Sequence, residues 1–201
     1  MKFILGRKLN MTQVFDKDGI VHPATIVDAS NVVVTQIKTK ENDGYTAVQV
    51  ATGGKNPNTL NKAMKGHLKD LGAFSDLREF RVDNPTQKVG DKVELAQFQE
   101  GDVIEVSAIT KGKGFQGVVK RHGFGGGPRS HGQKHSEREP GSIGGGLRNK
   151  VPKKMRMGGR MGSDRVTVKN LKVVHIDSAT NTLYISGAIP GRRGTLVEIT
   201  G

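Results

Sequence analysis

Short runs in which apolar and polar residues alternate dominate the two ends of the chain. They are rich in Val, Ile, Thr and aromatic residues, a composition and a period of two that are typical of β-strands. Turn-forming residues at positions 18–19, 29–31 and 42–44 predict hairpins between the first four runs. The predicted strands are residues 11–15, 20–28, 32–38, 45–51, 102–109, 165–176, 182–186 and 196–200. Short strands at turn-bounded intervals favour a mainly β fold built as a barrel.

A helical spacing interrupts the strands. Between Leu60 and Leu71, apolar residues recur at intervals of three or four, and Gly72 is placed to end a helix there. We therefore expect a short amphipathic helix, in an insertion of about residues 56–90, that covers an end of the barrel.

Residues 122–165 show neither the period of two of a strand nor the spacing of three or four of a helix. Fixing a backbone costs about 1 to 2 kcal/mol per residue, and the few large apolar side chains of this segment cannot offset that cost. Those side chains belong to Phe124, Ile143, Leu147, Val151, Met155, Met157 and Met161. We expect the segment to be disordered until a partner orders it.

The positive charge of the chain is concentrated in the same region. Residues 1–110 hold 14 basic and 14 acidic side chains, whereas residues 111–165 hold 14 basic and three acidic ones, for a net charge of +11 out of +13. These 55 residues also contain 15 of the 28 glycines. Charge and composition therefore divide the chain into a domain of residues 1–110 and 166–201 and a glycine-rich basic extension of residues 111–165. A polyanionic partner is the expected ligand of the extension.

Several classes of protein are excluded by what the chain lacks. It contains no cysteine, which removes disulfides, cysteine zinc sites and thiol nucleophiles. Its apolar runs are too short for a membrane span, and residues 3–5 are too short for the core of a signal peptide. We expect neither export nor a membrane partner.

The sequence from Gly112 to Val119 matches the glycine pattern of nucleotide-binding loops, Gly-x-Gly-x-x-Gly. A dinucleotide loop opens onto a helix that holds the pyrophosphate, and we expect no helix here because residues 118–124 are β-branched and then glycine-rich. The downstream motifs of a kinase are also missing. A flexible turn is one alternative, and contact of these amides and lysines with an RNA backbone is the one we favour.

His131 and His135 stand four residues apart, a spacing that places two metal ligands on one face of a helix. The surroundings are rich in Gly and Pro, and Gly132 lies where a metalloprotease has Glu. We therefore expect no metal and no cofactor, and expect the histidines to bind phosphates or stack on bases unless they simply face solvent. Serines near these histidines lack the nucleophile elbow of hydrolases, so no catalytic residue is predicted.

Cations that alternate with small or apolar residues, from Arg148 to Arg160, complete the basic extension. No acidic residue between positions 140 and 163 neutralises them, so we expect them to bind phosphates. The candidate RNA-binding residues are Lys111, Lys113, Lys120, Arg121, His122, Arg129, His131, Lys134, His135, Arg138, Arg148, Lys150, Lys153, Lys154, Arg156, Arg160 and Arg165.

Phe98, followed by Ala-Ile-Thr-Lys-Gly-Lys-Gly-Phe-Gln-Gly-Val-Val-Lys-Arg at 108–121, resembles the signature of the third large-subunit ribosomal protein family in its bacterial form. Residues 6–15, 140–144, 153–155, 159–168 and 187–191 extend the resemblance over nearly the whole chain. The signature departs at Glu105, where the family usually has Asp or Asn, which is a conservative change. Gly145 stands where some bacterial relatives carry a glutamine that is methylated, so that modification cannot occur here.

This resemblance implies a six-stranded split β-barrel like those of translation factors, and no enzyme activity. It implies a cytoplasmic, ribosomal protein that binds large-subunit RNA toward its 3′ end early in assembly and contacts the fourteenth and nineteenth large-subunit proteins, with no homo-oligomer. Residues 111–121 would be the root of the extension and residues 150–165 its returning arm. The tip, reaching toward the peptidyl transferase centre, would be Ser142, Ile143, Gly144, Gly145, Gly146 and Leu147.

Two other functions are compatible with the residues alone. One is a free basic module that binds DNA or RNA, which would bind generic duplexes tightly. The other is an enzyme that binds a nucleotide through Gly112 to Gly117, which would show saturable nucleotide binding.

Overall fold

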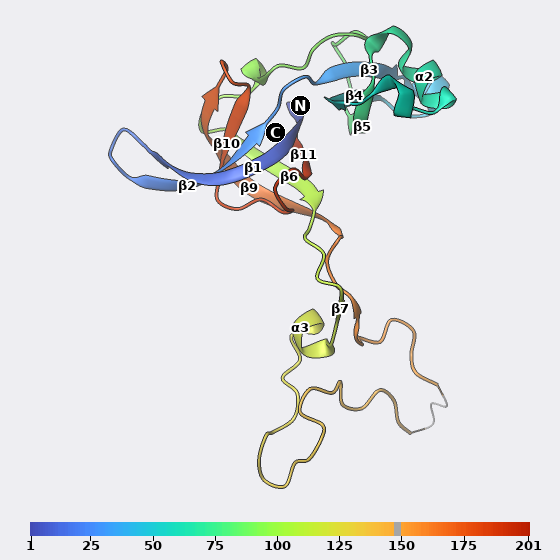
Figure 1. Cartoon of the computed structure of the whole chain (residues 1–201), viewed down its shortest axis with the longest axis vertical. Helices are drawn as coiled ribbons and strands as arrows, with labels where there is room; N and C mark the ends of the chain where they lie inside the picture. The colour runs from blue at the N-terminus through green and yellow to red at the C-terminus, as the bar shows by residue number, and fades with distance from the viewer. Residues whose placement is uncertain (147–149) are drawn as a thin grey trace. The chain divides into compact units, whose positions relative to one another are not determined.

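The computed structural model describes residues 1–146 and 150–201 (Figure 1). They form two compact units. Residues 1–109 and 165–201 make up the first, here called the ring unit, and residues 110–164 the second, the basic segment.

Six antiparallel strands of the ring unit form a closed barrel in the order β1-β11-β6-β9-β10-β2 (Figure 1). The strands are β1 (Phe3–Phe15), β2 (Val21–Asp28), β6 (Val103–Ile109), β9 (Arg165–Asp177), β10 (Thr182–Ser186) and β11 (Leu196–Thr200). Apart from the early start of β1, each matches one of the predicted strands to within one residue at either end, and the mainly β fold is confirmed. Because every strand has two neighbours, the barrel leaves no open edge.

Strand β1 begins at Phe3, eight residues before the predicted start at Met11. The alternation is lost there because Phe3, Ile4 and Leu5 are all buried, so that no polar residue marks a solvent face. An irregularity between Lys8 and Met11 then shifts the register with β2 and hides the period of two.

The strands predicted at 32–38 and 45–51 belong to a separate sheet. Its order is β3-β4-β5, with β3 at Val33–Lys38, β4 at Ala47–Gly54 and β5 at Phe74–Arg81 (Figure 1). The hairpin predicted at 29–31 is therefore wrong, since this turn takes the chain from the barrel to the second sheet. Strand β5 was missed because it is an edge strand in which four of eight residues are charged and only Phe80 is buried.

Both sheets share one hydrophobic core. Phe3 of β1 stacks on Phe80 of β5, with ring centroids 4.9 Å apart. Val34 and Val48 of the second sheet are fully buried in the same cluster. Each large apolar side chain buried in this way stabilises the fold by about 1.5 to 3 kcal/mol, so the ring unit holds the apolar surface that the basic segment lacks.

The predicted helix exists, but it is short and not where it was expected to pack. Helix α2 (Lys62–Leu68) lies between two 3-10 turns, η1 (Pro57–Thr59) and η2 (Lys69–Leu71), and η2 ends at Gly72. His67 contacts Gln49 of β4, with Nε2 and Oε1 2.7 Å apart, so the helix lies against the second sheet and not over an end of the barrel. Two further short elements of the unit are α1 (Lys40–Asp43), in place of the turn predicted at 42–44, and η3 (Leu95–Gln97).

The basic segment has little regular structure. Its elements are β7 (Phe115–Gln116), α3 (Val118–His122) and β8 (Gly159–Arg160). From residue 123 to residue 158 the described residues form neither helix nor strand. In the described part of the chain, no helix combines the length and the apolar composition that crossing a bilayer requires.

A helix does follow the glycine motif, contrary to expectation. It is only five residues long, and Gly123, at φ 71°, closes it by donating its N–H to the carbonyls of Val118 and Val119. Val118 is buried, so packing and this C-cap override the β-branched sequence.

Candidate nucleic-acid interface

A two-stranded ladder forms the root of the basic segment. The N–H of Lys113 donates to the carbonyl of Met161 at 3.0 Å, and that of Met161 to the carbonyl of Gly114 at 2.9 Å. Phe115 then pairs with Arg160 in the β7–β8 sheet. The ladder gives Lys111, Lys113 and Arg160 a defined backbone on which their side chains are exposed.

The ladder depends on the glycine at position 162. Gly162 has φ +75°, and a Cβ at this residue would lie 2.1 Å from the carbonyl oxygen of Lys111. No L-residue fits there without moving one arm of the ladder.

Helix α3 is fastened to the returning arm by two of the predicted RNA-binding residues. The Nη1 of Arg121 donates to the carbonyl of Met157 at 2.8 Å, and the Nε2 of His122 lies 3.0 Å from the same oxygen. Both side chains are half-buried. Arg121 and His122 therefore hold the segment together, whatever further contacts they make.

A second small cluster forms around Phe124. Its ring lies 5.9 Å from that of His122, and the guanidinium of Arg156 lies over it at 5.2 Å. Such a cation–π contact contributes about 0.5 to 1 kcal/mol at an exposed site. Arg156 keeps its full charge in this position, so it adds to the positive field of the segment.

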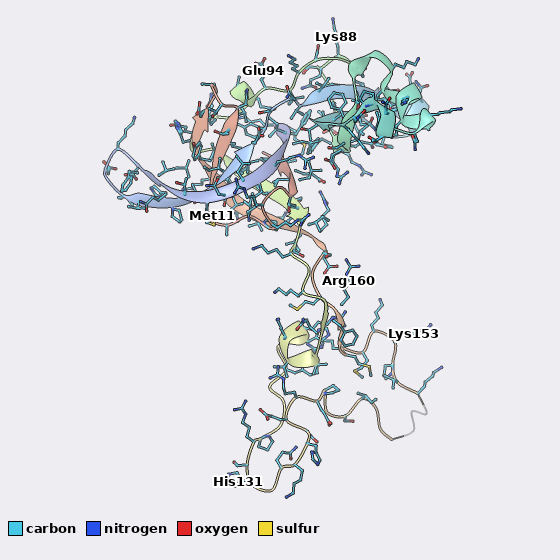
Figure 2. The ribbon with its side chains drawn as sticks, viewed as in Figure 1. Met11, Lys88, Glu94, His131, Lys153 and Arg160 are labelled. Atoms are coloured by element: carbon cyan, nitrogen blue, oxygen red, sulfur yellow. The ribbon has the colours of Figure 1, made fainter. Side chains whose placement is uncertain are left out.

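Residues 123–146 form a loop whose few internal bonds are local. Glu137 is its main anchor, because its carbonyl accepts from the N–H of Gly127 at 3.0 Å and its carboxylate pairs with Arg129. His131, at the far end of the loop, is exposed, as is His135 (Figure 2). No group of three metal-ligating side chains occurs among the residues that the structure describes.

Nine lysine and arginine side chains in the described part of the segment are exposed and form no ion pair, hydrogen bond or ring contact with other described residues; Lys153 and Arg160 are labelled in Figure 2. They are Lys111, Lys113, Lys120, Lys134, Arg138, Lys150, Lys153, Lys154 and Arg160. Their charges are not compensated within the segment, which makes it a strong anion-binding surface.

Three of the predicted positions fall outside the described part of the basic segment. Arg165 opens β9 in the ring unit and pairs with Glu198, which Arg78 also contacts at 2.9 Å. Arg148 and the tip residue Leu147 lie outside the described residues. The other tip positions, 142–146, are exposed, and the Ser142 hydroxyl donates to the carbonyl of Gly144 at 3.0 Å.

One residue that the sequence analysis did not select is Phe115. Its side chain is 80% exposed, and it follows Lys113 in the ladder. A Cβ on Gly158 would lie 3.3 Å from the Phe115 ring, so one edge of the ring rests on this glycine. The sequence did contain a signal for Phe115, because it is an aromatic residue within a run of glycines and lysines. Exposed aromatic side chains beside cations are the usual platforms on which nucleic-acid bases stack.

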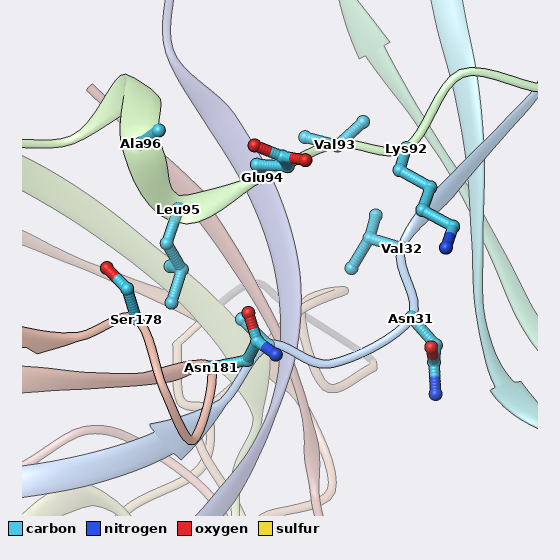
Figure 3. A pocket seen from close by; sticks show the side chains of 10 residues that line it. Asn31, Val32, Lys92, Val93, Glu94, Leu95, Ala96, Ser178 and Asn181 are labelled. Atoms are coloured by element: carbon cyan, nitrogen blue, oxygen red, sulfur yellow. The ribbon is translucent and has the colours of Figure 1, made fainter.

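In the ring unit, the lining of a pocket does not point to catalysis. A pocket there is lined by Asn31, Val32, Leu95 and Asn181, with Lys92 and Glu94 as its charged residues (Figure 3). The opposite charges of Lys92 and Glu94 cancel, and the pocket carries no nucleophile paired with a base.

The ionisable groups with altered pKa values in the ring unit belong to structural pairs. Hydrogen bonds with the Tyr45 hydroxyl and the Glu79 carboxylate raise the pKa of Lys38. The Lys2 ammonium, 2.5 Å away, lowers the pKa of Asp102. These shifts come from side-chain hydrogen bonds and ion pairs that join separate segments of the fold, so we assign these groups a structural role.

Comparison with known proteins gives consistent matches over the chain. A family described as Ribosomal protein L3 matches residues 55–187. The chain is 48% identical to the large ribosomal subunit protein uL3 of Herpetosiphon aurantiacus, an alignment that covers 98% of this chain and 94% of the relative. It is 48% identical to uL3 of Geotalea daltonii, over 98% and 95%, and 46% identical to uL3 of Staphylococcus epidermidis, over 99% and 96%.

The role of Gly162 in the root can be tested by Gly162→Ala. We expect the amides of Lys113 and Met161 to exchange with solvent at least about tenfold faster, because a left-handed alanine costs about 1 to 2 kcal/mol before its contact with the Lys111 carbonyl is counted. Gly125→Ala is the matched control, since that position has open space and no positive φ. Equal exchange in the two variants, measured by NMR, would contradict the account of the ladder.

Proposed function

Because this chain belongs to the ribosomal protein L3 family of the large subunit, we propose that its basic segment binds large-subunit RNA while its ring unit forms the folded body of the protein. As a family member it is a structural ribosomal protein and not an enzyme, and it works in cytoplasmic ribosomes in association with RNA and other ribosomal proteins.

The nine exposed and unpaired cations of the basic segment carry the proposal. Phosphate groups that neutralise them release condensed counterions, and this release supplies most of the affinity of a basic protein for RNA. Only Glu137, Glu139 and Asp164 oppose 13 basic side chains in residues 110–164, and Glu137 already pairs with Arg129. A polyanion is therefore the partner whose charge fits this surface.

Phe115 and the histidines add contacts that phosphate binding alone does not require. The exposed ring of Phe115 is placed to stack on an unpaired base, and His131 and His135 are free to bond phosphates or bases. Arg121 and His122, in contrast, contribute mainly by fixing α3 to the returning arm.

The tip is proposed to lie near the peptidyl transferase centre. Gly144 and Gly145 have no positive φ, and a Cβ on either would meet nothing within 4 Å in this protein. The backbone at these glycines is therefore open, which leaves room for RNA to pack closely against it. This reasoning supports the location that the family resemblance implies.

Early assembly on the 3′ region of the RNA, and contact with the fourteenth and nineteenth large-subunit proteins, complete the proposal. The hairpin formed by β1 and β2 supports a protein contact, because it exposes Met11, Phe15, Ile20 and Val21. An apolar surface of this kind, which carries few cations, suits a protein neighbour better than RNA.

We also infer that the closed barrel is related to the split barrels of translation factors, which its antiparallel six-stranded order supports.

Nucleotide binding by the glycine motif receives no support. Helix α3 has five residues, and its two last side chains point to Met157. The loop is used to build the ladder, since Lys113 and Gly114 both bond Met161.

Replacing residues 111–163 by Asn-Gly should separate folding from binding. Thr110 donates to the carbonyl of Asp164 at 2.9 Å, so a two-residue turn can join β6 to β9. We expect a folded β protein by circular dichroism, with at least a hundredfold loss of affinity for a transcript of the 3′ region of large-subunit RNA.

For the full chain, about seven phosphate contacts predict a slope near −5 to −6 for log affinity against log salt.

A slope shallower than −2 for the full chain, or affinity within about tenfold of it for the shortened protein, would contradict the proposal. A generic RNA duplex is the control ligand. Equal affinity for the transcript and the duplex would favour a free basic module instead.

At the tip, Gly145→Arg should permit subunit assembly but change the rate of peptide-bond formation or the sensitivity to drugs that act at the peptidyl transferase centre. Gly54→Arg adds the same side chain at an exposed and open position of the ring unit, and it should change neither property. Normal rates and drug sensitivity in purified Gly145→Arg ribosomes would remove the tip from that centre.

A further inference from the structure

A second group of lysines lies in the ring unit, outside the basic segment. Residues 1–110, which contain these lysines, have no net charge, so a count over this half of the chain does not reveal them. Residues 44–69 contain no acidic residue, and their four basic ones are Lys55, Lys62, Lys65 and Lys69. All four side chains are exposed, and none forms an ion pair among the described residues.

Helix α2 gathers three of these lysines. Lys62 and Lys65 lie three residues apart on α2, and Lys69 follows the helix as its C-cap residue. Leu68 of the same helix is buried, which holds the helix on the ring unit. The side chains of Lys62, Lys65 and Lys69 are exposed, so the helix and its C-terminal end present cations to solvent.

Two carboxylates of the neighbouring sheet are occupied by other cations. Asp76 and Glu79 of β5 lie in the sheet that α2 contacts through Gln49. Asp76 pairs with Arg7 at 2.6 Å, and Glu79 with Lys38 at 3.0 Å. The lysines of α2 therefore keep their charge available for a partner.

The polar groups around the helix are arranged as donors. The carboxamide oxygens of Asn56 and Asn61 accept from the backbone N–H groups of Asn58 and Met64, so the NH₂ groups of these exposed residues remain as donors. Lys69 adopts the unusual φ of 40° at the junction of α2 and η2. A surface of ammonium and amide donors suits the acceptor oxygens of phosphates.

We propose that Lys62, Lys65 and Lys69, together with Lys55, form a second RNA-binding surface on the ring unit, which contacts the phosphate backbone of large-subunit RNA. This inference rests on the proposed function, because it takes ribosomal RNA as the polyanion. RNA is favoured because residues 44–69 carry four exposed lysines and no acidic residue, a charge pattern that suits a phosphate backbone.

The test is the triple variant Lys62→Gln, Lys65→Gln, Lys69→Gln, in the full chain. Gln has a helix propensity close to that of Lys, so the fold should be kept. The matched control is Lys17→Gln, Lys88→Gln, Lys92→Gln, which removes the same charge at exposed positions next to acidic residues. Both proteins are titrated with the 3′-region transcript of large-subunit RNA over a series of salt concentrations.

We expect the slope of log affinity against log salt to be shallower by about 2 to 3 in the α2 variant. Each phosphate contact that is lost removes about 0.7 to 0.9 from the steepness of the slope. The control should stay within about 0.5 of the wild type. Replacing the same three lysines by Arg should restore the wild-type slope, which separates loss of charge from loss of fold.

Equal slopes for the α2 variant and the control would overturn the inference. The same result is expected if these lysines bind an acidic protein instead of RNA. If the wild type itself binds the transcript without steep salt dependence, the proposed function fails first. The two failures are thus distinguishable in one experiment.

Discussion

Mutual repulsion among uncompensated cations is the constraint on which the organisation of this protein depends. Residues 110–164 carry 13 basic and three acidic side chains, with few apolar residues to hold them together. Like charges at this density oppose compaction, and the segment has no core to balance them. Its structure is therefore complete only when an external polyanion supplies the missing negative charge, and RNA of the large subunit is that polyanion in the function proposed here.

The ring unit supplies what the basic segment cannot. A closed six-stranded barrel shares one core with a three-stranded sheet, and both arms of the segment leave from adjacent antiparallel strands, β6 and β9. The pairing of Ile109 with Arg165 continues into the root through Thr110 and Asp164. Rigid strands thus fix the start of the segment, and the ladder, helix α3 and the Met157 carbonyl extend this order as far as residue 122.

Much of this arrangement was predictable from the sequence. Alternation identified the strands of the barrel, and charge counting identified the basic region. The start of β1 and strand β5 were missed because local pattern fails where a run is wholly buried or lies at a charged edge. Helix α3 was missed because a C-cap and a distant carbonyl stabilise it against its own propensities. The lysines of α2 were missed because a count over residues 1–110 averages them with acids that are paired elsewhere in the fold.

Hydrogen exchange on the intact chain, free and bound to large-subunit RNA, tests the central claim most directly. Only three backbone hydrogen bonds bridge residues 125–158 in the described part of the segment. In the free protein we expect the amides of residues 125–146 and 150–158 to exchange at nearly intrinsic rates, while those of the β1–β11 ladder are protected. In the complex the same amides should become protected by at least a hundredfold, with the barrel unchanged. Strong protection of these residues in the RNA-free protein would contradict the account, since the segment would then fold without a partner for its charge.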